Sequence, residues 1–595
     1  MDCGIIHTEV LQHRGGGGVV ALRTRRVLVP SRRASPLALG VFGTVVLPAV
    51  SFHVSQRRAA VRAWRLAAAI VLVSLSLWPA LPVHAGAPTD LWVNAQYCAL
   101  CANGAHLWGV DAFATISSAL RAAPPGATVH VAPGSYQEDL RIERPVRLVA
   151  ATPGAVVAPR QSEVTITIAA NDVTVEGLEV TGGSQAAILV VGPDFQREPI
   201  RNVTIRNNIV RGGLFGIAAN IDAAWNYGTL PADGVEISGN SVSGCTRAIY
   251  VYNARAEITH NSVSQLVPEG IGIYSSQGSV SRIAANDLFV DSPNSRGIYI
   301  LDNQGTLVDG NSLVGTTDVL TPTTAIALYQ FDDLVLSNNR VEGFYWGADA
   351  CTGGTARVER NSFHNTAAWA ISFGTAITTT DVSIVDNTIR GSYWGLRLDD
   401  DGGYGLQATV RGNSFTDNVV GVQLASSVAG DQVAVHGNAF CRNLNAALRS
   451  ESEAPLDASE NWWGSNDGPG PMGSGDLVKG AATISVSPWM RLSATATADG
   501  EGQARIVATL ASAHYRLAGR ELLLTTTRGV FAESEGTTYS TVTDADGQAQ
   551  ATLSLRPGER ASISIGSACG PILSLSVSQS APALPLLFGR RSVPR

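Results

Sequence analysis

Residues 382–398 read VSIVDNTIRGSYWGLRL and contain one unit of a repeat. The unit holds a short alternating segment, Asn387, an apolar residue two positions later (Ile389), and a second alternating segment that starts at the small residue Gly395. A period of about 25 residues predicts a repeat architecture. The asparagine recurs at intervals of 21 to 32 residues, as Asn208, Asn240, Asn261, Asn286, Asn311, Asn339, Asn361, Asn387, Asn413, Asn438 and Asn461.

The apolar residues inside each unit alternate with period two, which is typical of strands, and Gly and Asn mark the breaks. No stretch inside the repeats has helical spacing long enough for the crossover helix of a βαβ unit. About 25 residues with two or three short strands fit one coil of a parallel β-helix, in which stacked coils bury a continuous core. Asparagine tolerates left-handed backbone angles at a corner, and stacked copies can hydrogen-bond into a ladder. The alternative is that these asparagines only mark surface turns.

Less regular coils are predicted before the first repeat asparagine, for example at 128–131 and 164–168. Phe113, Ile116 and Leu120 lie at helical spacing, with Asp111 as the candidate N-cap. We therefore expect a short amphipathic helix that caps the N-terminal end of the solenoid, because terminal repeats need such a cover.

Three segments resemble pectin-lyase-like right-handed β-helix proteins. Residues 111–138, with VHVAPGSYQE at 129–138, are similar to the N-terminal part of these proteins, and the asparagine units are similar to their parallel β-helix repeats. Asn461-Trp462-Trp463-Gly464 resembles the terminal coil of secreted bacterial members. The resemblance covers about 90–487 and implies an all-β, single-stranded, right-handed parallel β-helix. It does not fix an activity, because this scaffold carries lyases, hydrolases, esterases, epimerases, tailspikes and adhesins.

From about residue 491 the asparagine period stops and the chain becomes rich in Thr, Ala and Ser. Residues 517–531 and 541–549 resemble the invasin/intimin type of bacterial Ig-like (Big-1) domain. The resemblance implies a small antiparallel Ig-like β-sandwich over 491–580, with Asp546-Gly547 as a hairpin turn. The tail 581–595 is interpreted as a sorting or attachment signal.

Residues 57–85 read as a secretory signal peptide, with four arginines, an apolar run at 66–78 and a small-x-small cleavage site at 83–85. We interpret 1–85 as leader and signal peptide, and 1–56 as the product of a mis-assigned start. The protein is therefore expected to be exported to the extracellular space or cell surface, with the periplasm as the alternative. Membrane contact is expected only through the leader or the tail.

The net charge of the chain limits the classes of partner that it is expected to bind. The leader carries a charge of +8 and residues 86–595 carry −15, which gives −7 for the whole chain, and Lys479 is the only lysine. An acidic body without a basic stripe argues against nucleic-acid binding. It also disfavours simple electrostatic capture of anionic polysaccharides, so neutral glycans, or acidic ones bridged by Ca²⁺, are the easier partners. We expect a monomer.

Six cysteines follow the leader, and Cys98 and Cys101 are the candidate local disulfide in an exported protein. The alternative reading joins this pair with His106 as half of a metal site.

Aromatic residues form two rows along the predicted coils. If the residue after each small residue (Ile249, for example) points inward, the next residue points outward. This places Tyr250, Tyr274 and Tyr299 on the outer face, with Tyr329 two positions further along its strand. A second row is Trp346, Trp369 and Trp394. Such rings can stack on sugars; alternatively, the tyrosines only reflect sheet propensity and the tryptophans pack a corner of the core.

Charged candidates follow the aromatic track. Asp349, Arg397 and Asp399 fall in neighbouring coils and are the candidate catalytic residues for polysaccharide chemistry. Carboxylate clusters in loops suit Ca²⁺, the one cofactor considered, and solvated turn acids are the alternative. The candidate ligands are Asp332, Asp333, Asp399, Asp400 and Asp401.

The catalytic motifs of pectin methylesterases, polygalacturonases and alginate epimerases are missing. The sequence therefore favours an exported, non-catalytic glycan-binding or adhesive protein whose partner is an extracellular polysaccharide or surface glycan. The first alternative is a polysaccharide lyase or glycoside hydrolase that acts on a uronic-acid-containing polysaccharide. The second alternative is a structural surface protein.

Overall fold

The described part of the chain begins just after the predicted leader. The leader 1–85 and the tail 581–595 lie outside it. The computed structural model describes residues 88–190, 199–221, 232–375, 377–499, 501–567 and 569–579.

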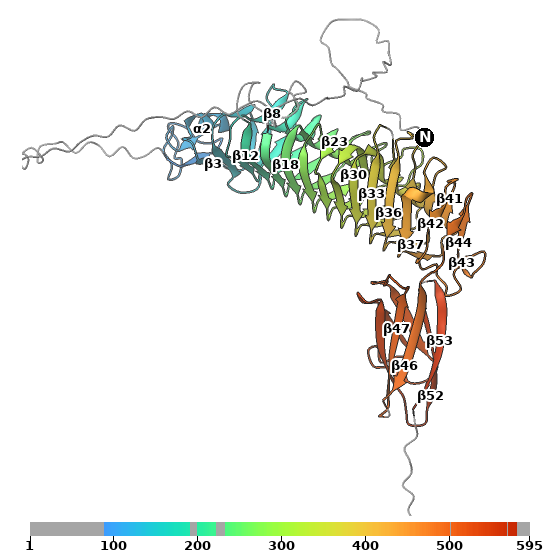
Figure 1. The fold of residues 1–595 in the computed structure, drawn as a ribbon. Coiled ribbons are helices and arrows are strands. Elements are labelled where there is room, and N and C mark those ends of the chain that lie inside the picture. The colour runs from blue at the N-terminus through green and yellow to red at the C-terminus, as the bar shows by residue number, and fades with distance from the viewer. Residues whose placement is uncertain are drawn as a thin grey trace, which may run out of the picture. The chain divides into compact units, whose positions relative to one another are not determined.

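The first part of the chain is a right-handed parallel β-helix, as predicted (Figure 1). Each regular coil contributes three strands, as in β33 (Thr380–Val385), β34 (Thr388–Arg390) and β35 (Trp394–Leu398). Each strand pairs in parallel with the equivalent strand of the next coil. Among the described residues these strands form three stacked sheets, of 17, 13 and 15 strands, called here the first, second and third sheet.

The first sheet contains β1 (Asp90–Val93), β2 (Ala112–Phe113), β3 (Ala127–Val131), β6 (Val146–Ala150), β9 (Val173–Glu176), β12 (Ile200–Arg206), β15 (Ala232–Ser238), β18 (Ala254–Thr259), β21 (Val280–Ala284), β24 (Leu307–Asp309), β27 (Leu334–Ser337), β30 (Thr355–Glu359), β33, β36 (Leu406–Arg411), β39 (Val433–His436), β42 (Leu456–Asp457) and β45 (Ile484–Ser485). The second sheet contains β4 (Gly134–Gln137), β7 (Ala155–Ala158), β10 (Glu179–Thr181), β13 (Ile209–Arg211), β16 (Ser241–Ser243), β19 (Ser262–Ser264), β22 (Asp287–Phe289), β25 (Ser312–Val314), β28 (Arg340–Glu342), β31 (Ser362–His364), β34, β37 (Ser414–Thr416) and β40 (Ala439–Cys441). The third sheet contains β5 (Leu140–Ile142), β8 (Val164–Ile168), β11 (Ala186–Val190), β14 (Phe215–Ala219), β17 (Arg247–Tyr252), β20 (Ile271–Ser276), β23 (Arg296–Gln304), β26 (Thr324–Asp332), β29 (Trp346–Gly353), β32 (Trp369–Gly374), β35, β38 (Val420–Leu424), β41 (Ala446–Ser450), β44 (Gly475–Gly480) and β43 (Pro469–Gly470).

The eleven repeat asparagines form a buried hydrogen-bonded ladder at the corner between the first and second sheets. Asn387 is typical: its side-chain oxygen accepts from the backbone N–H and the side-chain amide of Asn361. Its own amide donates to the carbonyl of Val358 and to the side chain of Asn413. Because all eleven are at most 2% exposed, the reading as surface turns is wrong.

The left-handed backbone angle falls on the residue before each ladder asparagine. Asp386 has φ 55°, Arg360 has φ 54° and Gly412 has φ 69°, whereas the ladder asparagines have no positive φ. The predicted reason for asparagine at this corner is therefore wrong in part. The position needs an amide that donates and accepts along the axis, and the neighbouring residue takes the strained conformation.

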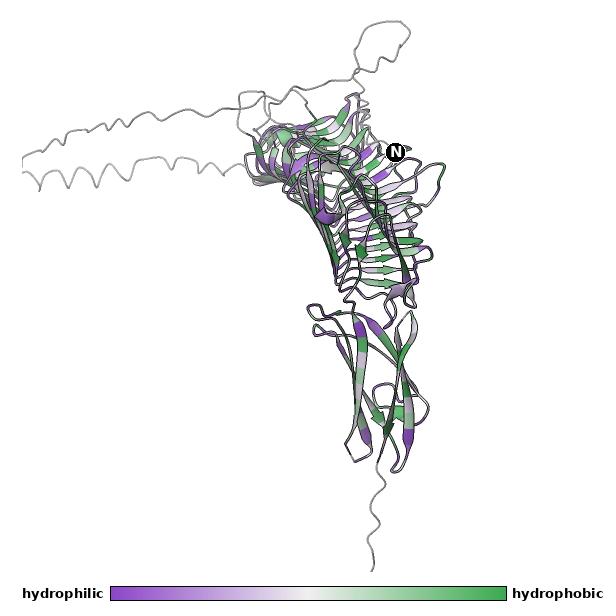
Figure 2. Ribbon diagram, turned by 45° about the vertical axis from the view of Figure 1, so that its right-hand side comes forward, coloured by the Kyte–Doolittle hydropathy of each residue, from purple (hydrophilic) through white to green (hydrophobic). Residues whose placement is uncertain are grey.

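One apolar core runs through the stacked coils, and Figure 2 shows apolar residues on many of the stacked strands. Near its C-terminal end the rings of Phe415, Phe440 and Trp463 stack with centroid distances of 5.2 and 4.9 Å. The small residue at the second position of the third-sheet strands from β14 to β38 also faces this core. A Cβ on Gly395, for example, would lie 2.5 Å from the carbonyl oxygen of Gly421.

A short helix, α2 (Ile116–Ala122), lies at the N-terminal end of the solenoid (Figure 1). Its N-cap is Thr115, so the predicted cap at Asp111 is wrong. The Asp111 carboxylate instead accepts from the backbone N–H of Leu107, and the predicted helix residue Phe113 lies in β2. The Glu138 carboxylate accepts from the first two backbone N–H groups of the helix, each at 2.8 Å, which suits the positive end of the helix dipole.

The described residues after β45 form two antiparallel four-stranded sheets around a second core cluster. The predicted Ig-like type of this unit stays a prediction. The Asp546-Gly547 turn leads from β50 to β51, which belong to different sheets, so it is not the predicted hairpin. The strands are β46 (Arg491–Ala498), β47 (Gln503–Ala511), β48 (Glu521–Thr526), β49 (Val530–Phe531), β50 (Thr538–Val542), β51 (Gln548–Ser554), β52 (Arg560–Ser567) and β53 (Gly570–Ser578).

Helices are rare. Beside α2 there is the 3-10 turn η1 (Gly430–Gln432), and within the described ranges no helix has the length and hydrophobicity needed to cross a membrane.

Candidate functional site

The outer face of the third sheet carries the residues singled out in the sequence. Strand register aligns one outward residue from each coil in a column, which we call the tyrosine column. The sequence pattern predicted the outward positions of its tyrosines, Tyr250, Tyr274 and Tyr299. Its members are Tyr250, Tyr274, Tyr299, Ala327, Asp349, Ser372, Arg397 and Gln423.

The tyrosine rings form a continuous stack on this face. Centroids are 5.1 Å apart for Tyr250 and Tyr274, and 5.0 Å apart for Tyr274 and Tyr299. Tyr329 extends the stack with an edge contact at 5.6 Å. Because the first two rings are nearly parallel, their faces cover each other and a ligand meets their hydroxyl-bearing edges.

The stack lies outside the main core but is partly shielded from water. None of the four tyrosines belongs to the core cluster of the solenoid. Burial raises the pKa of the Tyr299 phenol to about 12 and also raises the pKa of Tyr250, Tyr274 and Tyr329. All four hydroxyls are therefore neutral donors at physiological pH.

The three tryptophans continue the aromatic track on the same face. Trp346 and Trp369 stack with centroids 5.7 Å apart, and Trp369 and Trp394 lie 6.4 Å apart. The reading that placed them in a corner of the core is wrong, because they do not belong to the core cluster. Ala370 and Ile371 are successive residues of β32 and both belong to the core cluster, so simple alternation misplaces the tryptophan before them.

The predicted charged residues come together beside Trp369. The Arg397 guanidinium pairs with the Asp399 carboxylate and lies over the Trp369 ring, 5.6 Å from its centroid. Burial raises the pKa of Asp349 to about 6, against the opposing effects of the Trp369 indole and Arg397. Asp401 is exposed, and its pKa is raised mainly by a hydrogen bond with Asp399. The site therefore holds a carboxyl group that titrates near neutrality next to a paired Arg–Asp.

The five predicted calcium ligands do not converge. Asp332 accepts hydrogen bonds from the backbone and side chain of Thr355, and Asp400 accepts from Thr375 and the backbone of Tyr404. Asp332–Asp333 and Asp399–Asp401 end strands three coils apart, about 14 Å along the axis, so one ion cannot bridge them. Within the described ranges no group of three or more His, Cys, Asp or Glu side chains is placed to hold a metal ion.

A disulfide bond joins Cys98 and Cys101, the local pair singled out in the sequence. The ring of His106 lies 3.0 Å from the Asp111 carboxylate. The alternative metal site therefore has no free thiolates at this pair.

Two arginines of the same face were missed in the sequence. Arg247 lies over the rings of Tyr250 and Tyr274, 5.6 Å from each centroid, and Arg296 lies 5.4 Å from the centroid of Tyr299. The signal that would have found them is a shared motif, Arg-small-Ile-Tyr, which occurs at 247–250 and again at 296–299.

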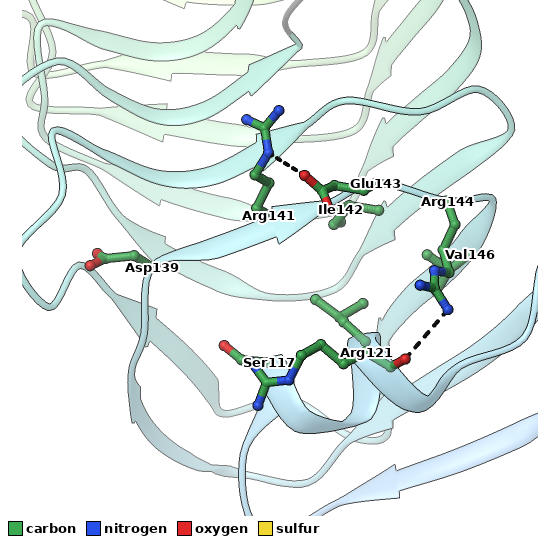
Figure 3. A pocket seen from close by; sticks show the side chains of 9 residues that line it. Ser117, Arg121, Asp139, Arg141, Ile142, Glu143, Arg144 and Val146 are labelled. Atoms are coloured by element: carbon green, nitrogen blue, oxygen red, sulfur yellow. Dashed lines mark hydrogen bonds and ion pairs between the residues drawn. The ribbon is translucent and has the colours of Figure 1, made fainter.

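Two pockets lie away from these residues. The first, of about 220 Å³, lies beside α2 and is lined by charged side chains (Figure 3). In it Arg141 pairs with Glu143 and Arg144 donates to the carbonyl of Arg121. The second, of about 460 Å³, lies on the first sheet between β15 and β24. None of the predicted site residues lines either pocket.

Two family models match the chain. A "Right handed beta helix region" matches residues 229–389, and a "Periplasmic copper-binding protein (NosD)" matches residues 162–294. No curated protein matches.

Several solved structures are similar at low identity. A C-terminal fragment of intimin in complex with the intimin-binding domain of its translocated receptor is 21% identical over 16% of this chain and 30% of its own, with a TM-score of 0.11. The tailspike of E. coli bacteriophage HK620 in complex with a pentasaccharide is 11% identical over 76% of this chain and 86% of its own, with a TM-score of 0.31. The catalytic domain of a GH87 α-1,3-glucanase in complex with nigerose is 13% identical over 63% and 66%, with a TM-score of 0.28. At these TM-scores the similarity carries no argument about function.

The two family matches agree with the three stacked sheets and the asparagine ladder. The chain is a parallel β-helix repeat protein.

Proposed function

We propose that the protein binds an extended polysaccharide along the outer face of the third sheet. One observation carries the proposal: seven successive strands of the third sheet, from β17 to β35, each place at least one aromatic side chain on this face and outside the core. The seven are Tyr250, Tyr274, Tyr299, Tyr329, Trp346, Trp369 and Trp394.

The dimensions and chemistry of the track suit a glycan. Six inter-strand steps span about 29 Å, which accommodates several sugar residues. The indole edges offer apolar contact to sugars, and neutral phenol hydroxyls donate to sugar oxygens. The buried indole N–H of Trp346 has no hydrogen-bond acceptor in the described part of the chain, so a ligand oxygen there would satisfy it.

We propose that the role is adhesive rather than catalytic and that the protein acts outside the cytoplasm. The predicted signal peptide at 57–85 and the missing catalytic motifs support this proposal. A copper role like that named for the NosD family is not proposed, because the described residues contain no fitting cluster of ligands.

Affinity electrophoresis of the purified protein through gels that contain neutral or acidic polysaccharides tests the proposal. We expect retardation by at least one glycan, and about three- to tenfold weaker binding for Trp369→Ala. Phe289→Ala is the matched control, because Phe289 is an exposed aromatic residue of β22 on the second sheet. Equal loss in both variants, or no retardation by any glycan, would refute the glycan-binding role.

Asp349 supports a second candidate function, cleavage of the bound polysaccharide. A carboxyl group with a pKa of about 6 is partly protonated near neutral pH and can act as a general acid. The neighbouring Arg397 would bind the charge that develops on the substrate.

Size-exclusion profiles of the polysaccharide before and after incubation separate the two functions. Shortened chains with the native protein, and intact chains with Asp349→Asn that still binds, would establish cleavage at this site. Chains that stay intact with the native protein while binding persists would reject it.

A further inference from the structure

We propose that Arg247 and Arg296 select a polysaccharide with a carboxylate on every second sugar. This inference rests on the proposed glycan-binding function and names the chemical class that the face recognises. It concerns two side chains that lie outside the core cluster and that form no ion pair with the residues the structure describes.

The two arginines occupy equivalent positions two coils apart. Register aligns Arg247 of β17 with Ile271 of β20, and Ile271 with Arg296 of β23. Trp346 of β29 lies in the same column, through Thr324 of β26. The Cα atoms of the two arginines are therefore about 10 Å apart along the axis, and this column flanks the tyrosine column.

Both guanidinium groups rest on aromatic rings instead of carboxylates. Arg247 lies 5.6 to 5.7 Å from the ring centroids of Phe215, Tyr250 and Tyr274, and Arg296 lies 5.4 Å from that of Tyr299. In the described ranges neither arginine forms an ion pair, and the buried Nε of Arg247 has no hydrogen-bond partner. The Asp349 carboxylate interacts with Arg296 only at longer range. A partly buried cation without a carboxylate in direct contact is costly in the free protein, which favours an anionic ligand.

Other outward arginines of the solenoid show the contrast. Arg206 lies 2.9 Å from Glu176 and Arg282 lies 2.7 Å from Glu257. Such pairs neutralise the charge on the first sheet. Ring contacts cover a face of the guanidinium groups of Arg247 and Arg296 and use none of their N–H donors.

A carboxylate fits this geometry. The planar guanidinium donates two parallel hydrogen bonds to a carboxylate, whereas a sugar hydroxyl meets only one. The two-coil spacing is close to the length of a disaccharide in an extended chain. The tyrosine hydroxyls between the arginines would meet the intervening neutral sugar. The local charge of this face thus differs from the acidic balance of the chain as a whole.

Affinity electrophoresis with hyaluronan, whose uronate alternates with an N-acetylated sugar, tests the inference. The comparison polymers are carboxyl-reduced hyaluronan and polygalacturonate, which has a carboxylate on every sugar. The variants are Arg247→Gln/Arg296→Gln and Arg296→Lys, with Arg282→Gln as a control that removes an outward arginine of β21 on the first sheet.

We expect the native protein to bind hyaluronan more tightly than either comparison polymer. The double variant should lose at least about tenfold in affinity for hyaluronan and keep its affinity for the carboxyl-reduced polymer. Arg296→Lys should lose most of the affinity for hyaluronan that Arg296 contributes, because an ammonium group cannot donate two parallel hydrogen bonds to one carboxylate. The control should bind like the native protein.

Three outcomes overturn the inference. Equal binding of hyaluronan and its carboxyl-reduced form would show that the carboxylate is not recognised, and the proposed glycan-binding function would remain. Tighter binding of polygalacturonate than of hyaluronan would reject the preference for a carboxylate on every second sugar. If neither these polymers nor a wider panel of neutral polysaccharides retards the protein, the proposed glycan-binding function is overturned as well.

Discussion

Asp349 combines an outward strand position with an environment that removes its carboxyl group from water. It lies in the tyrosine column between Ala327 and Ser372, and burial raises its pKa from the ordinary value of 3.8 to about 6. Between these two pH values the folded protein binds a proton that the unfolded chain releases. Stability therefore falls as pH rises from about 4 to 6, and above that pH the full cost remains.

Asp349→Asn should stabilise the protein above pH 6 and have little effect near pH 4. A shift of about two units corresponds to an upper limit of about 3 kcal/mol. Thermal unfolding midpoints at pH 4 and pH 8 measure the difference, with Ser372→Ala, the next residue of the column, as control. The same change in midpoint at both pH values would contradict this assignment of the pKa.

At the scale of the element, each corner between the first and second sheets depends on the asparagine of its own coil and of its neighbours. The side chain of Asn387 joins three coils, since it accepts from Asn361 and donates to Asn413. Its removal leaves the buried backbone N–H of Asn361 without its acceptor and takes one donor from each of the carbonyls of Val358 and Val385, while Asn413 keeps the backbone N–H of residue 387.

We expect Asn387→Ala to lower the free energy of unfolding by roughly 3–5 kcal/mol, because each unsatisfied buried group costs about 1–3 kcal/mol. The exposed neighbour Thr388 gives the control, and Thr388→Ala should change the value by less than about 0.5 kcal/mol. Urea unfolding midpoints provide the measurement. Similar midpoints for the two variants would show that the ladder contributes little.

At the scale of the whole molecule, the solenoid is a one-dimensional stack in which each coil contacts mainly its neighbours. Trp463 closes the core near its C-terminal end; it is fully buried and stacks on Phe440. Loss of the Trp463 side chain should therefore lower the local stability of the coils nearest that end.

Trp463→Ala should cost about 3–5 kcal/mol locally. It should reduce hydrogen-exchange protection in β40 and β41 while β8 and β11 keep theirs. Met472→Ala is the control, since Met472 is 85% exposed. Uniform loss of protection from end to end would contradict the neighbour-only coupling.

The sequence by itself determined the coil, the stacking direction and the order of the tyrosine column. These features follow from local rules that every unit repeats: period-two alternation, an asparagine at a fixed offset, and a small residue before the third-sheet strand. For the same reason Tyr250, Tyr274, Asp349 and Arg397 were aligned correctly.

Only the tertiary structure decided how these side chains meet. Ala370 and Ile371 both face the core, so Trp369 lies on the outer face and not in the core. The raised pKa of Asp349 and the ring contacts of Arg247 arise from side chains that other coils contribute. Desolvation and charge pairing depend on neighbours about 25 residues away in the chain, which the pattern of a single unit does not encode.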